Sequence, residues 1–213
     1  MKYIRRTLLL LLPALAILVA DLEAQSKFAI PATDEGLPGA GPIRRYGWFK
    51  NLWERKRSGW AKRGKQDQGA LVFLGDSITQ GWGDSMGGSF PGVKVANRGI
   101  SGDTTRGVLI RLKEDVLSLK PTGIVLLIGT NDLCATCGIP GQLEHDRIVD
   151  AYAKVIAACN KAGSYPGMGG VYKNDLMEKY LSMGIRVAQA GSDTALLIQA
   201  GKERIEFLNS LDR

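Results

Sequence analysis

The chain has 213 residues, of which 45% are hydrophobic and 23% are charged, and its formal net charge is +7. This length is sufficient for one domain with a sizeable core. The charge is mild for a chain of this size, so composition alone does not indicate nucleic acid as a partner. The three cysteines form an odd set, which excludes a small domain built on a disulfide framework.

The N-terminal stretch, residues 1–24, has the composition of a secretory signal peptide. A basic head from Met1 to Thr7 precedes a leucine-rich run that ends at Ala20. This run is too short for a comfortable membrane span. We therefore expect cleavage after Ala20 or Ala24 and export to the periplasm or the extracellular space. The alternative is an uncleaved anchor, which is the one way in which we expect this chain to contact a membrane.

Residues 25–47 are expected to form a linker or an extended arm, because their first part is rich in Ala, Gly and Pro. The next stretch, residues 44–65, interleaves aromatic residues with Arg and Lys. Its apolar residues recur at helical spacing, so we predict an amphipathic helix that packs on the core. Binding of a polyanion or a sugar by these side chains is the alternative. The helix-spaced pairs are Trp48 with Leu52 and Phe49 with Trp53.

The stretch Leu71–Trp82 is predicted to form a buried strand, a tight turn and the start of a helix. Its apolar run, Leu71–Leu74, is typical of a parallel strand that is covered on both faces. Gly75 permits a sharp turn, and Asp76 and Ser77 follow where the unpaired N–H groups of a helix start are expected. The Ser77 hydroxyl would lie close to donors that stabilise negative charge. A role of Ser77 as a helix cap is the alternative.

The remaining elements alternate between strand and helix along the chain. Such alternation predicts an α/β fold in which a parallel sheet lies between two helix layers. The predicted strands cover 93–96, 123–128 and 185–190, and the predicted helices run from Asp103 to before Pro121, from Asp146 to Gly163, over 174–183 and over 193–211.

Polar segments follow three of the predicted strands: residues 76–77, 97–103 and 130–132. The carboxyl ends of parallel strands meet at one edge of a sheet, where binding sites form. Acyl transfer needs a nucleophile, a base and donors for the oxyanion. Ser77 can be the nucleophile, and Asn131 offers an amide donor. Each segment alone is ordinary turn chemistry, but three on successive strand ends favour a catalytic site.

These three segments resemble the first three sequence blocks of the SGNH (GDSL) hydrolases. The resemblance covers about residues 48–132. It implies a flavodoxin-like three-layer α/β/α sandwich that hydrolyses esters of lipids, sugars or small acyl groups without a metal or a cofactor. It also implies that Ser77 is the nucleophile, and that the N–H groups of Ser77 and Gly102 form the oxyanion hole with the Asn131 amide. The matching motifs are Gly75-Asp-Ser-Ile-Thr-Gln-Gly81, Asn97-Arg-Gly-Ile-Ser-Gly-Asp103 and Gly129-Thr-Asn-Asp132.

The fourth block of that family, an Asp-x-x-His pair near the C-terminus, has no full counterpart in this sequence. Its nearest equivalent is Asp193-Thr-Ala-Leu196, where leucine replaces the histidine. His145 is the only histidine of the chain, so it is the one imidazole that can serve as the base, with Glu144 or Asp146 to orient it. A surface or capping role for His145 is the alternative. Loss of a triad member lowers turnover by about four to six powers of ten.

Cys134 and Cys137 have the C-x-x-C spacing of a redox pair or of half a zinc site. The sequence has no second pair, so a structural zinc site would lack ligands. We expect buried or incidental thiols, and a local disulfide after export is the alternative.

From about residue 131 the sequence resembles a second family, the metal-dependent 2-oxo-acid aldolases of the hydroxy-oxoheptanedioate type. The segments that carry this resemblance are 131–142, 167–170, 180–184 and 190–193. It implies that Asp132 binds Mg²⁺ or Mn²⁺, although the other metal ligand and the substrate arginine of that (β/α)8 barrel have no counterpart in the chain. The two families therefore meet at a shared segment that begins at Asn131.

The sequence thus predicts an exported serine ester hydrolase of the SGNH type with an altered C-terminal half. We assign residues 48–213 to one domain, in which the aldolase-like residues 133–213 would complete the sheet. The substrate would be a small-molecule, carbohydrate or lipid ester, and nucleic acid is not expected as a partner. The alternatives are a non-catalytic binding protein that keeps the pocket and a remnant of an aldolase.

Overall fold

The computed structural model describes residues 27–134 and 138–211. The chain divides into two compact units, Met1–Gly138 and Ile139–Arg213, and each is described by itself. The predicted signal peptide at 1–24 and Cys137 lie outside the described residues, as does the side chain of Cys134, so the proposed disulfide lies outside them too. Within the two described ranges, no helix is both long enough and apolar enough to cross a membrane.

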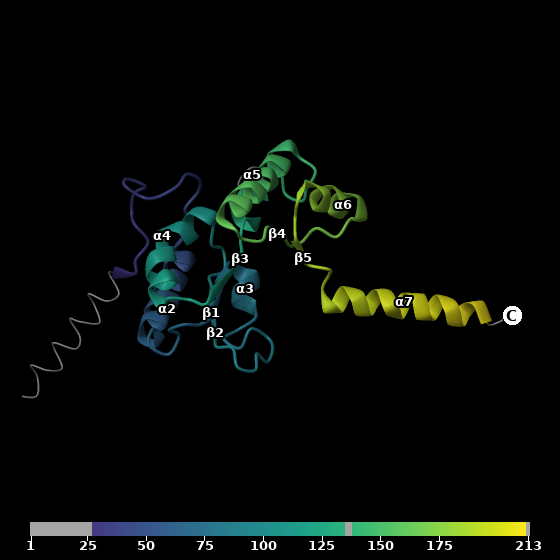
Figure 1. Cartoon of the computed structure of the whole chain (residues 1–213), viewed down its shortest axis with the longest axis horizontal. Coiled ribbons are helices and arrows are strands. Elements are labelled where there is room, and N and C mark those ends of the chain that lie inside the picture. The colour runs from purple at the N-terminus through teal and green to yellow at the C-terminus, as the bar shows by residue number, and fades with distance from the viewer. Residues whose placement is uncertain (1–26, 135–137, 212–213) are drawn as a thin grey trace, which may run out of the picture. The chain divides into compact units, whose positions relative to one another are not determined.

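A three-stranded parallel sheet forms the centre of the first unit (Figure 1). Strand β1, Leu71–Gly75, lies between β2, Val95–Gly99, and β3, Gly123–Leu127. The register places the last residue of β1 opposite Gly99 on one side and opposite Leu127 on the other. All three strands therefore end at the same edge, as predicted from the alternation of strand and helix.

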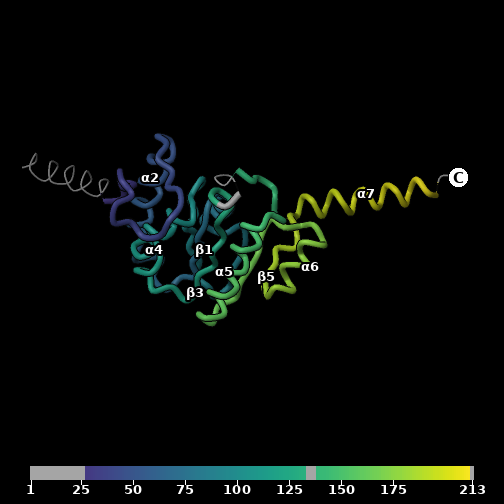
Figure 2. Tube along the Cα trace, turned by 90° about the horizontal axis from the view of Figure 1, so that it is seen from above, coloured from purple at the N-terminus to yellow at the C-terminus, as the bar shows by residue number. Residues whose placement is uncertain are grey.

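Two helices, α2 (Gly47–Arg63) and α4 (Thr105–Asp115), lie side by side in the first unit (Figures 1 and 2). Together with a single helical turn, η1 (Leu117–Leu119), α4 packs on one face of the sheet. The helix predicted within 44–65 is thereby confirmed. The core against the sheet contains Ala70, Val72, Leu74, Ala96, Val108, Val116 and Leu119. The core beneath α2 contains Ile30, Phe49, Trp53, Trp60 and Ile100.

The short helix α3 (Ser77–Gly81) and the loop after it cover part of the opposite face of the sheet. Asn97 of β2 donates through Nδ2 to the carbonyl oxygens of Thr79, at 2.6 Å, and Gly83, at 2.8 Å. Beside Asn97 on this face, the ring of Phe73 lies against two aromatic rings of the loop, Trp82 and Phe90. With α4 on one face of the parallel sheet and α3 on part of the other, the predicted three-layer α/β/α architecture is confirmed.

Several boundaries in the first unit differ from the sequence prediction. Strand β2 begins at Val95 instead of residue 93, β3 ends at Leu127 instead of residue 128, and α4 ends at Asp115 instead of continuing to Pro121. Strand β2 continues to Gly99 instead of ending at residue 96. Polar residues can continue this strand because their buried side chains have hydrogen-bond partners. For example, Asn97 Oδ1 accepts a hydrogen bond from Gly99 N at 2.8 Å. The N-cap of α4 is Thr104 rather than Asp103, since its Oγ1 accepts from Gly107 N at 3.1 Å.

The second unit contains helices α5 (Asp146–Ala162), α6 (Asn174–Met183) and α7 (Asp193–Leu211), whose predicted bounds are confirmed. Strand β5 (Val187–Ala188) pairs in parallel with β4 (Gly167–Met168), a strand that the sequence did not predict. In the part of the chain that the structure describes, these two strands form a separate sheet. The expectation that this segment completes the larger sheet is therefore wrong, because β5 finds its partner within its own unit.

Candidate active site

Ser77 is the first residue of α3 and follows the central strand of the sheet. The residue before it, Asp76, is the N-cap, because its Oδ1 accepts a hydrogen bond from Ile78 N at 3.0 Å. The alternative role of Ser77 as the cap is therefore wrong. Ser77 is exposed, and within residues 27–134 neither its Oγ nor its backbone N–H has a hydrogen-bond partner.

The strand ends bring the three predicted segments together. The N–H of Ile100 donates to the carbonyl oxygen of Gly75 at 3.1 Å, which ties the second segment to the end of β1. Asn131 Nδ2 donates to the carbonyl oxygen of Asp103 at 2.9 Å, and it lies 3.4 Å from Asp76 Oδ2. The segments after β1, β2 and β3 are therefore adjacent within the first unit.

Gly102 adopts a backbone conformation that favours glycine, with a φ of +85°. A Cβ atom at this position would lie 2.9 Å from Trp48 Cη2 and 3.0 Å from Arg44 Nη1. The backbone N–H of Gly102 has no hydrogen-bond partner within residues 27–134. The backbone N–H groups of Ser77 and Gly102, two of the donors expected from the sequence, are therefore both open within residues 27–134.

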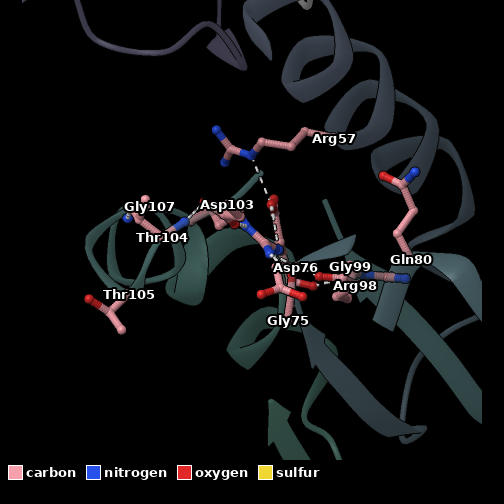
Figure 3. A network of polar contacts seen from close by, with 12 residues as sticks. Arg57, Gly75, Asp76, Gln80, Arg98, Gly99, Asp103, Thr104, Thr105 and Gly107 are labelled. Carbon is pink, nitrogen blue, oxygen red and sulfur yellow. Dashed lines mark hydrogen bonds and ion pairs between the residues drawn. The ribbon is translucent and has the colours of Figure 1, made fainter. Parts of the chain in front are cut away.

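A buried guanidinium fastens the strand ends to one another. Arg111 is fully buried, and its Nε donates to Asp103 Oδ2 at 2.8 Å. Its Nη2 donates to the carbonyl oxygens of Gly75, at 3.2 Å, and Arg98, at 2.9 Å. Figure 3 shows Gly75, Arg98 and Asp103 close together in this network. One side chain of α4 therefore sets the positions of β1, β2 and the residue after Gly102.

The same network contains two more buried ion pairs, which lie under α2. Arg98 pairs with Asp67 at 2.7 Å, and Arg57 pairs with Asp115 at 2.8 Å.

Arg111 Nη1 has no hydrogen-bond partner in the described part of the chain. Its guanidinium instead lies over tryptophan rings, which attract a cation electrostatically. The ring centroids are 5.8 Å away for Trp53 and 5.5 Å away for Trp60.

The carboxyl group of Asp76 has a pKa above its usual value of 3.8, because burial disfavours its charged form. Hydrogen bonds from backbone N–H groups oppose this shift, the charge of Asp132 adds to it, and the charge of Arg44 opposes it. A carboxyl pKa that folding raises gives stability that is complete below the unfolded value and is lost as the pH rises through the folded value.

We therefore expect Asp76→Asn, which keeps a capping acceptor, to gain stability relative to the wild type as the pH rises from about pH 4 to about pH 7. Urea unfolding of both proteins across this range measures the difference in the free energy of unfolding. A difference that stays constant or shrinks with rising pH would contradict the assignment of Asp76 as a buried, destabilised carboxylate.

His145 belongs to the second unit, where it is the N-cap of α5. Its Nδ1 accepts a hydrogen bond from Arg147 N at 3.2 Å, so the capping role considered for this residue is present. With Nδ1 as the acceptor, the neutral imidazole carries its proton on Nε2. The carboxylate of Glu144, one of the two groups expected to orient the ring, pairs with Lys173 Nζ at 3.2 Å.

Asp132 is buried and fastens the start of α4. Its Oδ2 accepts hydrogen bonds from Thr105 N, at 2.8 Å, and from Thr105 Oγ1. Its Oδ1 has no partner in the described part of the chain. Residues 27–134 and 138–211 contain no group of three or more His, Cys, Asp or Glu that could hold a metal ion. These residues therefore do not fit the Mg²⁺ or Mn²⁺ site that the aldolase resemblance implies.

Solved structures similar to this chain include several ester hydrolases. A GDSL-like lipase from Bacteroides thetaiotaomicron is 23% identical, with a TM-score of 0.35 and coverage of 60% of this chain and 69% of that chain. An acetyl xylan esterase from Geobacillus stearothermophilus is 22% identical, with a TM-score of 0.34 and coverage of 55% and 71%.

Two kinds of curated relative match different amounts of the chain. An acetylxylan esterase from Geobacillus stearothermophilus is 30% identical over an alignment of 105 residues, and the match covers 38% of this chain and 48% of that protein. A 4-hydroxy-2-oxovalerate aldolase from Rhodococcus jostii is 38% identical over 72 residues, which is 34% of this chain and 28% of that protein. The chain thus spans less than half the length of each of these relatives.

The GDSL-like Lipase/Acylhydrolase family matches residues 73–196. This range contains Ser77, Gly102 and Asn131, and it extends beyond the residues 48–132 on which the sequence resemblance was based. It ends at Leu196, the position where the sequence resemblance predicted a histidine. More than half of the chain is matched, and the chain belongs to the GDSL-like lipase/acylhydrolase family.

Proposed function

We propose that this chain is a serine ester hydrolase. Ser77 Oγ attacks the ester carbonyl carbon, the alcohol leaves with a proton, and water then hydrolyses the acyl-serine. The N–H groups of Ser77 and Gly102 and the Asn131 amide stabilise the oxyanion. The observation that carries this proposal is the convergence of these three residues at the strand ends, with two backbone N–H groups left open within residues 27–134.

The general base is the unusual part of this proposal. Leu196 stands where the family pattern has histidine, so His145 is the one imidazole that can accept the Ser77 proton. As the cap of α5, its Nδ1 already accepts a backbone N–H. His145 would therefore act as a base only when this capping bond opens, and we propose that turnover is impaired for this reason.

We propose an acylated carbohydrate as the substrate. The rings of Tyr46 and Trp48 are 61% and 55% exposed and nearly parallel, with an interplanar angle of 13°. Trp48 also lies against Gly102, so this pair borders the oxyanion hole. Exposed aromatic faces beside a reactive centre suit the apolar face of a sugar ring. The acetylxylan esterase among the relatives supports the same substrate class.

The test is hydrolysis of p-nitrophenyl acetate and of an acetylated xylooligosaccharide. We expect Ser77→Ala to lower kcat/KM by about a thousandfold or more on both, because the nucleophile is lost. Ser89→Ala removes the same hydroxyl from an exposed loop serine, and we expect it to retain wild-type rates. Equal rates for wild type and Ser77→Ala would reject serine catalysis.

A non-catalytic binding protein is the second candidate function. The observation that favours it is the His145 cap, in which Nδ1 accepts the backbone N–H of Arg147. Under this reading the wild type and Ser77→Ala hydrolyse no ester but bind the acetylated oligosaccharide equally well in calorimetry. An aldolase remnant is a further alternative, supported by the partial aldolase matches, and it requires pyruvate-forming activity that depends on Mg²⁺ or Mn²⁺.

The proposal includes export. It is supported by the basic head and the leucine-rich run within residues 1–24. Expression with and without these residues, followed by fractionation of the cells, tests it.

A further inference from the structure

Arg44 lies at the oxyanion hole without a carboxylate of its own. Its Nη2 is 3.5 Å from the carbonyl oxygen of Asn131, and its Nη1 is 3.0 Å from the position that a Cβ atom of Gly102 would occupy. Within residues 27–134, no Asp or Glu lies within ion-pair distance of this guanidinium. Its neighbour Arg45 differs, because it pairs with Asp34 at 2.5 Å.

The segment that carries Arg44 is fastened on both sides of it. Upstream, Asp34 pairs with Arg45 and with Arg106, and Arg106 Nη1 also donates to the carbonyl oxygen of Gly41 at 3.0 Å. Thr104 Oγ1, next to the oxyanion loop, donates to the carbonyl oxygen of Pro42 at 2.8 Å. Downstream, α2 begins at Gly47. The backbone on both sides of Arg44 is therefore held in place, and this limits where its guanidinium can lie, as electrostatic preorganisation requires.

Two negatively charged carboxylates lie near the oxyanion hole, so a cation there can help to stabilise the oxyanion. Asp76, which precedes the nucleophile, and Asp132 are both buried, and their negative charges would oppose a developing oxyanion. The charge of Arg44 is among the causes that lower the pKa of Asp76, against the larger effect of burial that raises it. The charge of Arg44 therefore acts electrostatically on the turn that carries Ser77.

We propose that Arg44 supplies the oxyanion hole with a fixed positive charge. This charge adds to the three hydrogen-bond donors of the hole, which come from Ser77, Gly102 and Asn131. This inference rests on the proposed serine chemistry. It assigns an electrostatic role to a residue that precedes the matched range 73–196. Arg44 stabilises the tetrahedral species, so its loss lowers kcat more than it raises KM.

Phenylboronic acid provides a test that does not depend on turnover. A bond forms between Ser77 Oγ and boron, the hydroxyl proton is released, and a tetrahedral boronate with one negative charge remains. Calorimetry measures the affinity, and boron NMR reports the tetrahedral state. We expect Arg44→Gln to weaken binding about a hundredfold, and Arg44→Lys to recover most of the affinity because it restores the charge.

The controls separate this proposal from the proposed function. Arg55→Gln removes the same charge from an exposed position of α2, and we expect it to bind like the wild type. Ser77→Ala must abolish binding, and unchanged binding by this variant would reject the serine chemistry itself. If binding depends on Ser77 but Arg44→Gln matches the wild type, the charge proposal is wrong. If Arg44→Lys binds phenylboronic acid as weakly as Arg44→Gln, the shape of the arginine side chain matters rather than its charge. This outcome also overturns the charge proposal.

Discussion

Replacing Arg111 with Met is expected to lower the free energy of unfolding by roughly 3 to 5 kcal/mol. The substitution leaves the Asp103 carboxylate buried without the guanidinium that is 2.8 Å away. It also removes the donor to the carbonyl oxygens of Gly75, the last residue of β1, and of Arg98, the residue before the end of β2. Urea unfolding followed by circular dichroism measures this loss.

The matched control is Arg55→Met, because Arg55 is exposed on α2 and the same atoms are changed. We expect its free energy of unfolding to stay within about 0.5 kcal/mol of the wild type. The double variant Asp103→Asn with Arg111→Met should recover part of the loss, because no buried charge is then left alone. If Arg111→Met costs no more than the control, the network does not hold the strand ends.

Adding one methyl group at Gly75 is expected to cost about 3 kcal/mol, the upper end of the usual range for overpacking. A Cβ atom at this position would lie 2.3 Å from the carbonyl oxygen of Leu127 and 2.3 Å from Thr79 Oγ1. The first of these is backbone of the neighbouring strand, which cannot rotate away. We therefore expect Gly75→Ala to shift the turn before Ser77, and to lower both the melting temperature and ester hydrolysis.

Gly59→Ala provides the comparison for that substitution. Gly59 lies in the middle of α2, and no atom lies within 4 Å of its Cβ position. Alanine has the higher helix propensity, so we expect this variant to gain roughly 0.5 to 1 kcal/mol of stability. The two glycines should thus respond with opposite signs. A Gly75→Ala variant with unchanged melting temperature and activity would show that the turn has more space than the structure gives it.

Helices were the elements best predicted from the sequence. The bounds of α6 and α7 are as predicted, because Gly184 ends the first of them and Asp193 begins the second. Strand β2 was placed less well, since Asn97 and Arg98 do not look like strand residues until their buried partners are known. Local pattern carries capping information but not the tertiary contacts that satisfy a polar side chain in a core.

The separate sheet of the second unit was beyond the reach of the sequence for a related reason. Strands β4 and β5 have two residues each, which is too short for an apolar periodicity to be recognised. Which strand pairs with which depends on contacts between distant segments. The helices of this half of the chain were therefore predicted correctly, while strand β4 and the pairing of β4 with β5 were not.

The adjacency of Ser77, Gly102 and Asn131 followed from one physical rule, that parallel strands end at a common edge. No such rule links Arg44 to Gly102, because the segment before α2 has no regular structure whose spacing could be extrapolated. Arg111 was missed for another reason. Its place in the sequence is that of an ordinary helical arginine, and only the fold shows that it is buried.

The position of β1 in the middle of its sheet has a consequence for biosynthesis. Because the strand order is β2-β1-β3, the first strand of this sheet to leave the ribosome has neither of its neighbours available. Both pairings wait for segments that follow a helix or a long loop, and such non-local contacts form slowly. Until β2 is complete, the apolar side chains of β1 have no sheet to enter, and one side of β1 stays unpaired until β3 is made. The nascent chain therefore has its period of greatest exposure to aggregation before the first unit is finished, when a holding chaperone is most useful.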